Sequence, residues 1–368
     1  MYPRTAGAST CLSAGLLFVV ACAAARGATD ELRLEAARDV LLQRQAAVGA
    51  LLGWLSQQDI PPQQDRIIAA AFLILGELRQ PEAVPLLARH WSFFWSADFH
   101  ATPADYPAIL SLAAIGLPAM PALTEIAAQG YNGEEVGPPL TDCLSSMAHG
   151  RMIREMLQQA ADAERDPGRA RRLRSTARDV GGRGSSESPE AIIPAGLANW
   201  PRVLETAPPP LGEAFRVMEQ CEAAVKALSD WLLSIESLQE ETRETQRAAV
   251  EAMEILGKFR LPEGIPGLKK HWKFVRPGED GKELEDYPAL VALREIGLPS
   301  FEALMDIAVE GDEGEAITWP LSEVFAKMGP ADAVAEFIEW KAGREIDPDR
   351  YKRLMATAAA VRQTVPNR

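Results

Sequence analysis

Histidine followed by tryptophan occurs twice in the chain, as His90-Trp91 and His271-Trp272. The ordinary pKa of histidine lies near neutral pH, so such a side chain can act as a general base or metal ligand, with the aromatic rings as a platform. No acidic residue or second ligand recurs at a fixed spacing from either histidine. We therefore favour a structural role, in which the aromatic rings fill the core and the histidine bonds a loop, and keep His90 and His271 as the functional alternative.

The motif Asp-Tyr-Pro also occurs twice, at 105–107 and 286–288, and could present a carboxylate and a phenol to a substrate. Aspartate just ahead of a first-turn proline is more typical of a helix N-cap. The sequence contains no Gly-rich phosphate loop, nucleophile elbow or H-E-x-x-H motif. The acidic run at 279–285 lacks the spacing of an EF-hand. We expect a non-enzyme without cofactor or metal.

Two pairs of corresponding loops differ in character. The loop at 95–104 is aromatic, whereas 276–285 is strongly polar, and 131–135 differs from 312–316. Ordinary surface variation is one explanation, and recognition of different partners is the other. If the loops bind partners, the first candidates are Trp95, Phe99, His100 and Tyr131.

Six arginines between 165 and 178 form a basic patch in an otherwise acidic chain. The chain has 38 basic and 52 acidic residues, a net charge of −14, which repels the phosphate backbone of nucleic acids. The patch is either a solvated helix face or a surface for an acidic partner. Arg169 and Arg172 are its candidate partner contacts.

The first 25 residues read as an export segment, with one arginine followed by about ten apolar residues, too few to span a bilayer. Val19-Val-Ala-Cys22 resembles the lipobox of bacterial lipoproteins, and Ala23–Ala25 would instead suit an ordinary signal peptidase. The resemblance implies an outer-membrane lipoprotein with lipid on Cys22 as its only membrane contact. Cleavage after the alanines implies a periplasmic or secreted protein.

Two other cysteines, Cys143 and Cys221, remain beyond the leader. Both fall on apolar faces of expected helices, where a free cysteine behaves as a small hydrophobe. Core packing is the favoured interpretation, and a disulfide is the alternative that an exported protein leaves open.

The chain is a tandem duplication. Residues 74–93 recur at 255–274 and 105–118 at 286–299, both at an offset of 181, and the offset falls to 177 upstream. We therefore divide the chain into a leader and tether at 1–28, a first block at 29–180, a Gly/Ser/Pro linker at 181–212 and a second block at 213–368.

Each copy is expected to be all-α. Apolar residues follow the 3.6-residue period, and Pro and Gly mark helix starts and ends. The expected helices of the first copy lie near 32–56, 65–79, 82–94, 105–115, 119–129, 139–148, 151–162 and 167–180. Eight helices would form four hairpins.

The segments 75–87 and 115–123 resemble the turns of HEAT repeats, in which a small-residue turn joins two helices, and 256–268 keeps the same form. The resemblance implies an α-α superhelix of stacked, armadillo-like hairpins in two tandem blocks, and most often protein binding. Some HEAT-like families assist cofactor attachment. We therefore expect an exported, non-catalytic scaffold or adaptor that binds another protein, with an enzyme or accessory protein that uses the His-Trp positions as the alternative.

Overall fold

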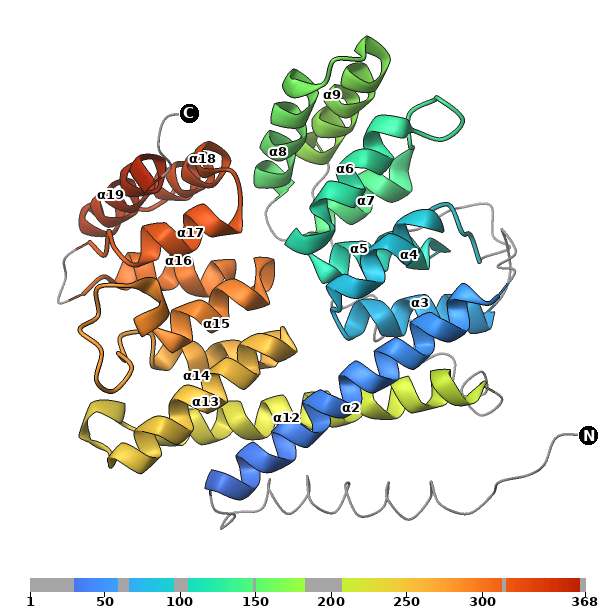
Figure 1. The fold of residues 1–368 in the computed structure, drawn as a ribbon. Helices are drawn as coiled ribbons and strands as arrows, with labels where there is room; N and C mark the ends of the chain where they lie inside the picture. Colours follow the sequence, from blue (N-terminus) through green and yellow to red (C-terminus); the bar gives the residue numbers. More distant parts are fainter. Residues whose placement is uncertain are drawn as a thin grey trace, which may run out of the picture. The chain divides into compact units, whose positions relative to one another are not determined.

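The computed structural model describes residues 30–58, 66–95, 105–147, 150–182, 207–312 and 316–364. These residues form an all-α protein whose helices pack in pairs, and no strand occurs among them (Figure 1). None of the helices in these ranges has both the length and the hydrophobicity that crossing a bilayer requires. The expected leader with Cys22 lies outside the described residues.

The helices of the first copy are α2 (Asp30–Ser56), α3 (Arg66–Glu77), α4 (Val84–Arg89), α5 (Pro107–Ile115), α6 (Met120–Gln129), α7 (Pro138–Ser146), α8 (Gly150–Ala163) and α9 (Pro167–Gly182). Those of the second are α12 (Pro209–Ser234), α13 (Arg243–Phe259), α14 (Ile265–Lys270), α15 (Pro288–Ile296), α16 (Phe301–Glu310), α17 (Leu321–Met328), α18 (Ala331–Ala342) and α19 (Pro348–Thr364). The prediction of eight helices per copy is confirmed for the described residues.

The helix expected at 82–94 is shorter than predicted. A 3-10 turn at Pro81–Ala83 leads into α4, which ends at Arg89. The chain then turns, with the backbone N–H of Phe93 donating to the carbonyl of His90. This turn buries the Phe93 ring against Phe72, with 5.5 Å between ring centroids. The His-Trp motif therefore follows a helix instead of lying on one.

The aspartates of the two Asp-Tyr-Pro motifs do not cap the helices that follow them, whereas two other aspartates do. The carboxylates of Asp166 and Asp347 accept backbone N–H bonds three residues later, as N-caps do. Tyr106, not Asp105, is the N-cap of α5. Asp286 instead accepts the backbone N–H of Glu283, within the 3-10 turn ahead of α15. The Asp-Tyr-Pro motif places its carboxylate one residue too early to cap the following helix.

The glycines predicted to end α5 and α15, Gly116 and Gly297, both have positive φ, at 79° and 82°. Their ψ angles are −136° and −139°, outside the left-handed helical region. The turn therefore leads directly into another helical segment in each copy.

Helices α3 and α5 pack so closely that no side chain fits at Gly76. A Cβ atom there would lie 2.7 Å from the Cα atom of Ser111. The Ser111 hydroxyl donates to the carbonyl of Phe72 at 2.7 Å across the same crossing. The second copy repeats the arrangement, because a Cβ at Gly257 would lie 3.0 Å from the Cα of Ala292. The glycine of the repeated Leu-Gly motif thus sets the distance between paired helices.

By their contacts, the described residues fall into two compact units. One unit combines the chain up to Ala46 with Arg216–Glu295, and the other combines Ala47–Phe215 with the chain from Ile296 onward. Each unit therefore contains segments from both copies of the duplication. The predicted blocks, 29–180 and 213–368, follow the repeat in the sequence and therefore divide the chain differently from the two compact units.

Arg44 of α2 is a structural part of the first unit. Its side chain is fully buried, and its Nη1 atom donates to the carbonyl of Lys258 at 2.9 Å. Its guanidinium lies 5.7 Å from the ring centroid of Phe259. Because the last carbonyls of a helix have no partner within it, Arg44 completes the C-terminal end of α13. An ion pair between Arg38 and Glu251 joins the same two helices.

The close approach at Gly76 gives a stability test. We expect Gly76→Ala to lower the free energy of unfolding by about 1–3 kcal/mol, because the added methyl group meets backbone atoms. The matched control is Gly49→Ala in α2, where a Cβ meets nothing within 4 Å. Because alanine has a higher helix propensity than glycine, Gly49→Ala should raise the free energy of unfolding by up to about 1 kcal/mol. Equal effects of the two substitutions in urea denaturation would contradict the close-packing argument.

Candidate functional site

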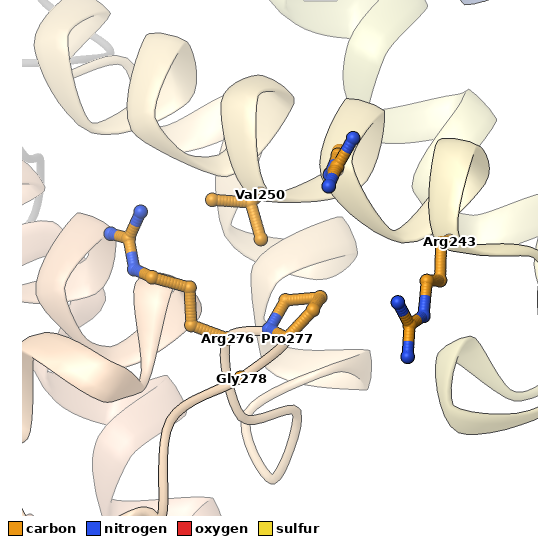
Figure 2. A pocket seen from close by; sticks show the side chains of 6 residues that line it. Arg243, Val250, Arg276, Pro277 and Gly278 are labelled. Atoms are coloured by element: carbon orange, nitrogen blue, oxygen red, sulfur yellow. The ribbon is translucent and has the colours of Figure 1, made fainter.

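The polar loop of the second copy lines a pocket together with the start of α13. Arg243, Arg247 and Val250 lie about one turn apart on the helix and, with the turn at 276–278, line a cavity of about 310 Å³. Figure 2 shows this pocket from close by. Helix α13 starts here because the Thr242 hydroxyl accepts the backbone N–H of Thr245. The loop was a predicted candidate, whereas the two helix arginines were not; their four-residue spacing is the signal in the sequence that places them on one helix face.

The main role of the Arg276 side chain is to hold the loop in place. Its Nη1 atom donates to Glu254 at 2.8 Å, and its side chain extends from Pro277 away from Arg243 (Figure 2). The corresponding residue in the first copy is Trp95. The two copies therefore differ in both charge and aromatic content at this position.

The first copy instead displays an exposed aromatic pair, Trp91 and Tyr131. Their rings meet edge to face at 89°, with 5.8 Å between centroids. Tyr131 is 56% exposed and Trp91 is partly exposed. In the second copy Asp312 takes the place of Tyr131, and Trp272 is only 9% exposed. We call the pair Trp91–Tyr131 the aromatic corner.

A tight turn after α6 presents Tyr131. The backbones of Tyr131 and Glu134 exchange two hydrogen bonds of 3.0 Å. Gly130 precedes them with φ of 70°, and a Cβ atom there would lie 1.9 Å from the Glu134 carbonyl oxygen. Only glycine can therefore hold this turn closed against the end of the helix.

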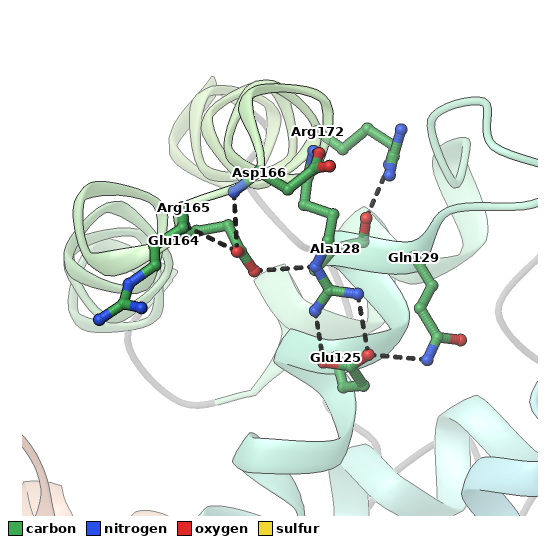
Figure 3. A network of polar contacts seen from close by, with 8 residues as sticks. Glu125, Ala128, Gln129, Glu164, Arg165, Asp166 and Arg172 are labelled. Carbon is green, nitrogen blue, oxygen red and sulfur yellow. Dashed lines mark hydrogen bonds and ion pairs between the residues drawn. The ribbon is translucent and has the colours of Figure 1, made fainter.

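Arg172 of α9 also holds this turn in place. Its Nε atom donates to the carbonyl of Ala128 at 2.7 Å (Figure 3). Its Nη1 atom donates to the carbonyl of Gly133 at 3.1 Å. The Ser175 hydroxyl donates to Glu135 one turn further along α9. Arg172 thus joins the C-terminal end of α6, the turn and α9 in one hydrogen-bonded clamp.

Arg169 lies one turn before Arg172 and is also engaged within the chain. Its two Nη atoms donate to Glu125 at 3.1 and 2.7 Å, and its Nε atom donates to Glu164 at 2.8 Å (Figure 3). The hydrogen bonds from Arg169 hold the pKa of the Glu125 carboxyl below its usual range. Contact of Arg169 and Arg172 with a partner stays a prediction; in the described structure they support α6.

The clamp recurs in the second copy at the same offset. Arg353 of α19 donates through Nε to the carbonyl of Val309 at 2.6 Å, as Arg172 does to Ala128. The hydroxyls of Thr176 and Thr357 each donate to the carbonyl four residues earlier, again at equivalent positions. The bond to the helix end therefore belongs to the shared framework, while the sequences that follow the two helices, 131–135 and 312–316, differ.

Of the other predicted partner contacts, only Trp95 lies in the described residues. Its backbone N–H donates to the carbonyl of Asp105 at 3.2 Å, and its side chain is partly exposed. Arg276 makes the equivalent bond to Asp286. Phe99 and His100 lie outside the described residues, so their contact with a partner stays a prediction.

The two repeated histidines have different surroundings. His271 is buried, and its Nε2 atom hydrogen-bonds the carbonyl of Leu232 at 2.8 Å, near the end of α12. Lys270 donates to the next carbonyl, that of Leu233, at 2.7 Å. The His90 ring instead stacks on Phe72, with 6.0 Å between centroids. Burial lowers the pKa of both imidazoles.

The chemistry available for metal binding is sparse in the described part of the chain. No group of three or more His, Cys, Asp or Glu residues there is placed to hold a metal ion.

The two cysteines beyond the leader, Cys143 and Cys221, are free thiols buried in the core, as the favoured interpretation predicted. Burial raises the pKa of Cys143, and raises that of Cys221 to about 12. Neither thiol is activated as a nucleophile.

The buried imidazole of His271 predicts a pH dependence of stability. Its pKa is lower in the folded than in the unfolded state, so the unfolded chain binds the extra proton as pH falls. Stability should therefore be highest above the unfolded pKa near 6.5 and decrease as pH falls below it. We expect His271→Gln, whose amide nitrogen reaches the position of Nε2 and can still donate to Leu232, to flatten the change in urea midpoint between pH 7.5 and 5.5. If the urea midpoint of the variant changed with pH as much as that of the parent chain, the His271 imidazole would have to be exposed to solvent.

Comparison with known proteins gives no match for this chain, whether with family models, with curated proteins or with solved structures.

Proposed function

We propose that the protein is a non-catalytic scaffold or adaptor that binds another protein through the aromatic corner. The observation that carries the proposal is the exposed Tyr131 ring set edge to face on Trp91. Exposed aromatic residues held in a fixed geometry are typical anchors of protein interfaces, because they bury a large area at little cost in conformational entropy.

The support beneath the corner agrees with this role. Arg172 and Gly130 fix the turn that carries Tyr131, so the ring is positioned before a partner arrives. Such preorganisation lowers the entropic cost of binding. Because an aspartate, Asp312, stands in the second copy where the first has Tyr131, we propose that only the first copy uses this position for an apolar contact.

We further propose that the helix pairs are HEAT-like hairpins stacked as a superhelix in each block. The close glycine crossings of α3 with α5 and of α13 with α15 support this arrangement, since they recur in both copies. A stack of such hairpins buries the apolar face of each pair against the next pair and leaves the loops free to vary. The leader suggests that the scaffold acts in the cell envelope, with lipid on Cys22 or after secretion.

The enzyme alternative relies on His90 and His271, and their surroundings support a structural role instead. The His271 imidazole is engaged with a helix carbonyl, and the His90 ring lies on Phe72. A catalytic base must reach the proton that it takes from a substrate. A His271 imidazole already bonded to Leu232 is poorly placed to do so.

Site-specific photocrosslinking tests the proposal. A photoreactive phenylalanine analogue at Tyr131 should give a discrete crosslinked protein in cells of the native host. The matched control is the same analogue at Asp312, the equivalent position of the second copy, which should not capture that protein.

A second substitution separates specific binding from chance proximity. Trp91→Ala removes the ring against which Tyr131 packs, and it should reduce the crosslinked product at position 131 by about tenfold, as expected for the loss of an interface anchor. Capture that is equal at positions 131 and 312, or indifferent to Trp91, would contradict the proposal.

A further inference from the structure

We infer that the pocket between α13 and the turn at 276–278 binds a phosphate group, through the guanidinium groups of Arg243 and Arg247. The inference concerns the second copy and is independent of the aromatic corner. The pocket of about 310 Å³ is large enough for a small phosphorylated molecule or a single headgroup.

The first observation is the state of the two arginines. Arg243 and Arg247 are exposed and form no ion pair with the described part of the chain. The third arginine of the pocket, Arg276, is bonded to Glu254. In a chain of net charge −14, two guanidinium groups that have no acidic partner among the described residues border the same cavity.

The second observation is where the two arginines lie. They occupy the first two turns of α13, a helix of 17 residues, four positions apart on the same face. The N-terminal end of a helix carries a partial positive charge, and like charges four residues apart repel each other. An anion in the cavity would relieve both unfavourable interactions.

The third observation is the chemistry of the lining. Val250, Pro277 and Gly278 add no carboxylate to the cavity, and Arg276 is directed to Glu254 on the other side of Pro277 (Figure 2). Guanidinium groups donate in a planar fork that matches the oxygens of a phosphate. The geometry therefore assigns the binding to Arg243 and Arg247, with Arg276 holding the turn in place.

Titration with inorganic phosphate at constant ionic strength, followed by calorimetry, tests the assignment on the full chain. We expect saturable binding that weakens at least tenfold in the double variant Arg243→Gln with Arg247→Gln. The matched control is Arg66→Gln, which removes the equivalent of Arg247 at the start of α3 and should leave binding unchanged. Both arginines of the double variant are exposed, so its thermal midpoint without phosphate should equal or exceed that of the parent chain.

A second arm distinguishes a soluble phosphate from a lipid headgroup. The same variants are tested for binding to vesicles of phosphatidylglycerol and to vesicles of phosphatidylcholine. If phosphate binds in solution and this binding requires Arg243 and Arg247, the ligand of the pocket is a small phosphorylated molecule. Phosphatidylglycerol binding alone, lost in the double variant but kept in Arg66→Gln, assigns a lipid headgroup. Binding in neither arm, or binding that the double variant retains, overturns the inference.

Discussion

The structure depends on one recurring interaction, in which a basic side chain completes the C-terminal end of a neighbouring helix. Arg44 does so for α13, Arg172 for α6, Arg353 for α16 and His271 for α12. Each bonds a carbonyl in the last turn of the helix, and for the three arginines this is the end where the helix dipole favours positive charge. With sixteen α-helices in the described part of the chain, many such ends must be satisfied.

The second constraint is the distance between paired helices. Gly76 and Gly257 allow α3 and α13 to approach their partners more closely than any side chain would permit. The duplicated sequence preserves this crossing and the arginine bond at the ends of α6 and α16, while the sequences after these two helices have diverged. Framework and variable surface are therefore separated within each copy. A partner-binding protein can change one without disturbing the other, and this separation is the basis of the function proposed above.

Much of the fold could be predicted from the sequence, because helix periodicity and the positions of Pro and Gly are local signals. The bounds of α8 and α9 agree within a few residues. The early end of α4 was not predictable, because it depends on burial of Phe93 against a ring distant in sequence. Arg169 and Arg172 read as a surface patch, since nothing in the sequence indicates that their partners lie on α6. The pocket was missed for the same reason: Arg247 and Pro277 come together only in the folded chain.

Hydrogen exchange of the clamp variants tests the central claim most directly. Loss of a charged hydrogen bond to a helix end costs about 1–3 kcal/mol, so Arg172→Ala should speed exchange at 126–136 by about tenfold or more. Arg353→Ala should act on 307–312 and leave 126–136 unchanged, and neither variant should alter the protection of α3 and α5. Unchanged exchange at 126–136 in Arg172→Ala, or equal loosening of the whole chain in both variants, would contradict the account.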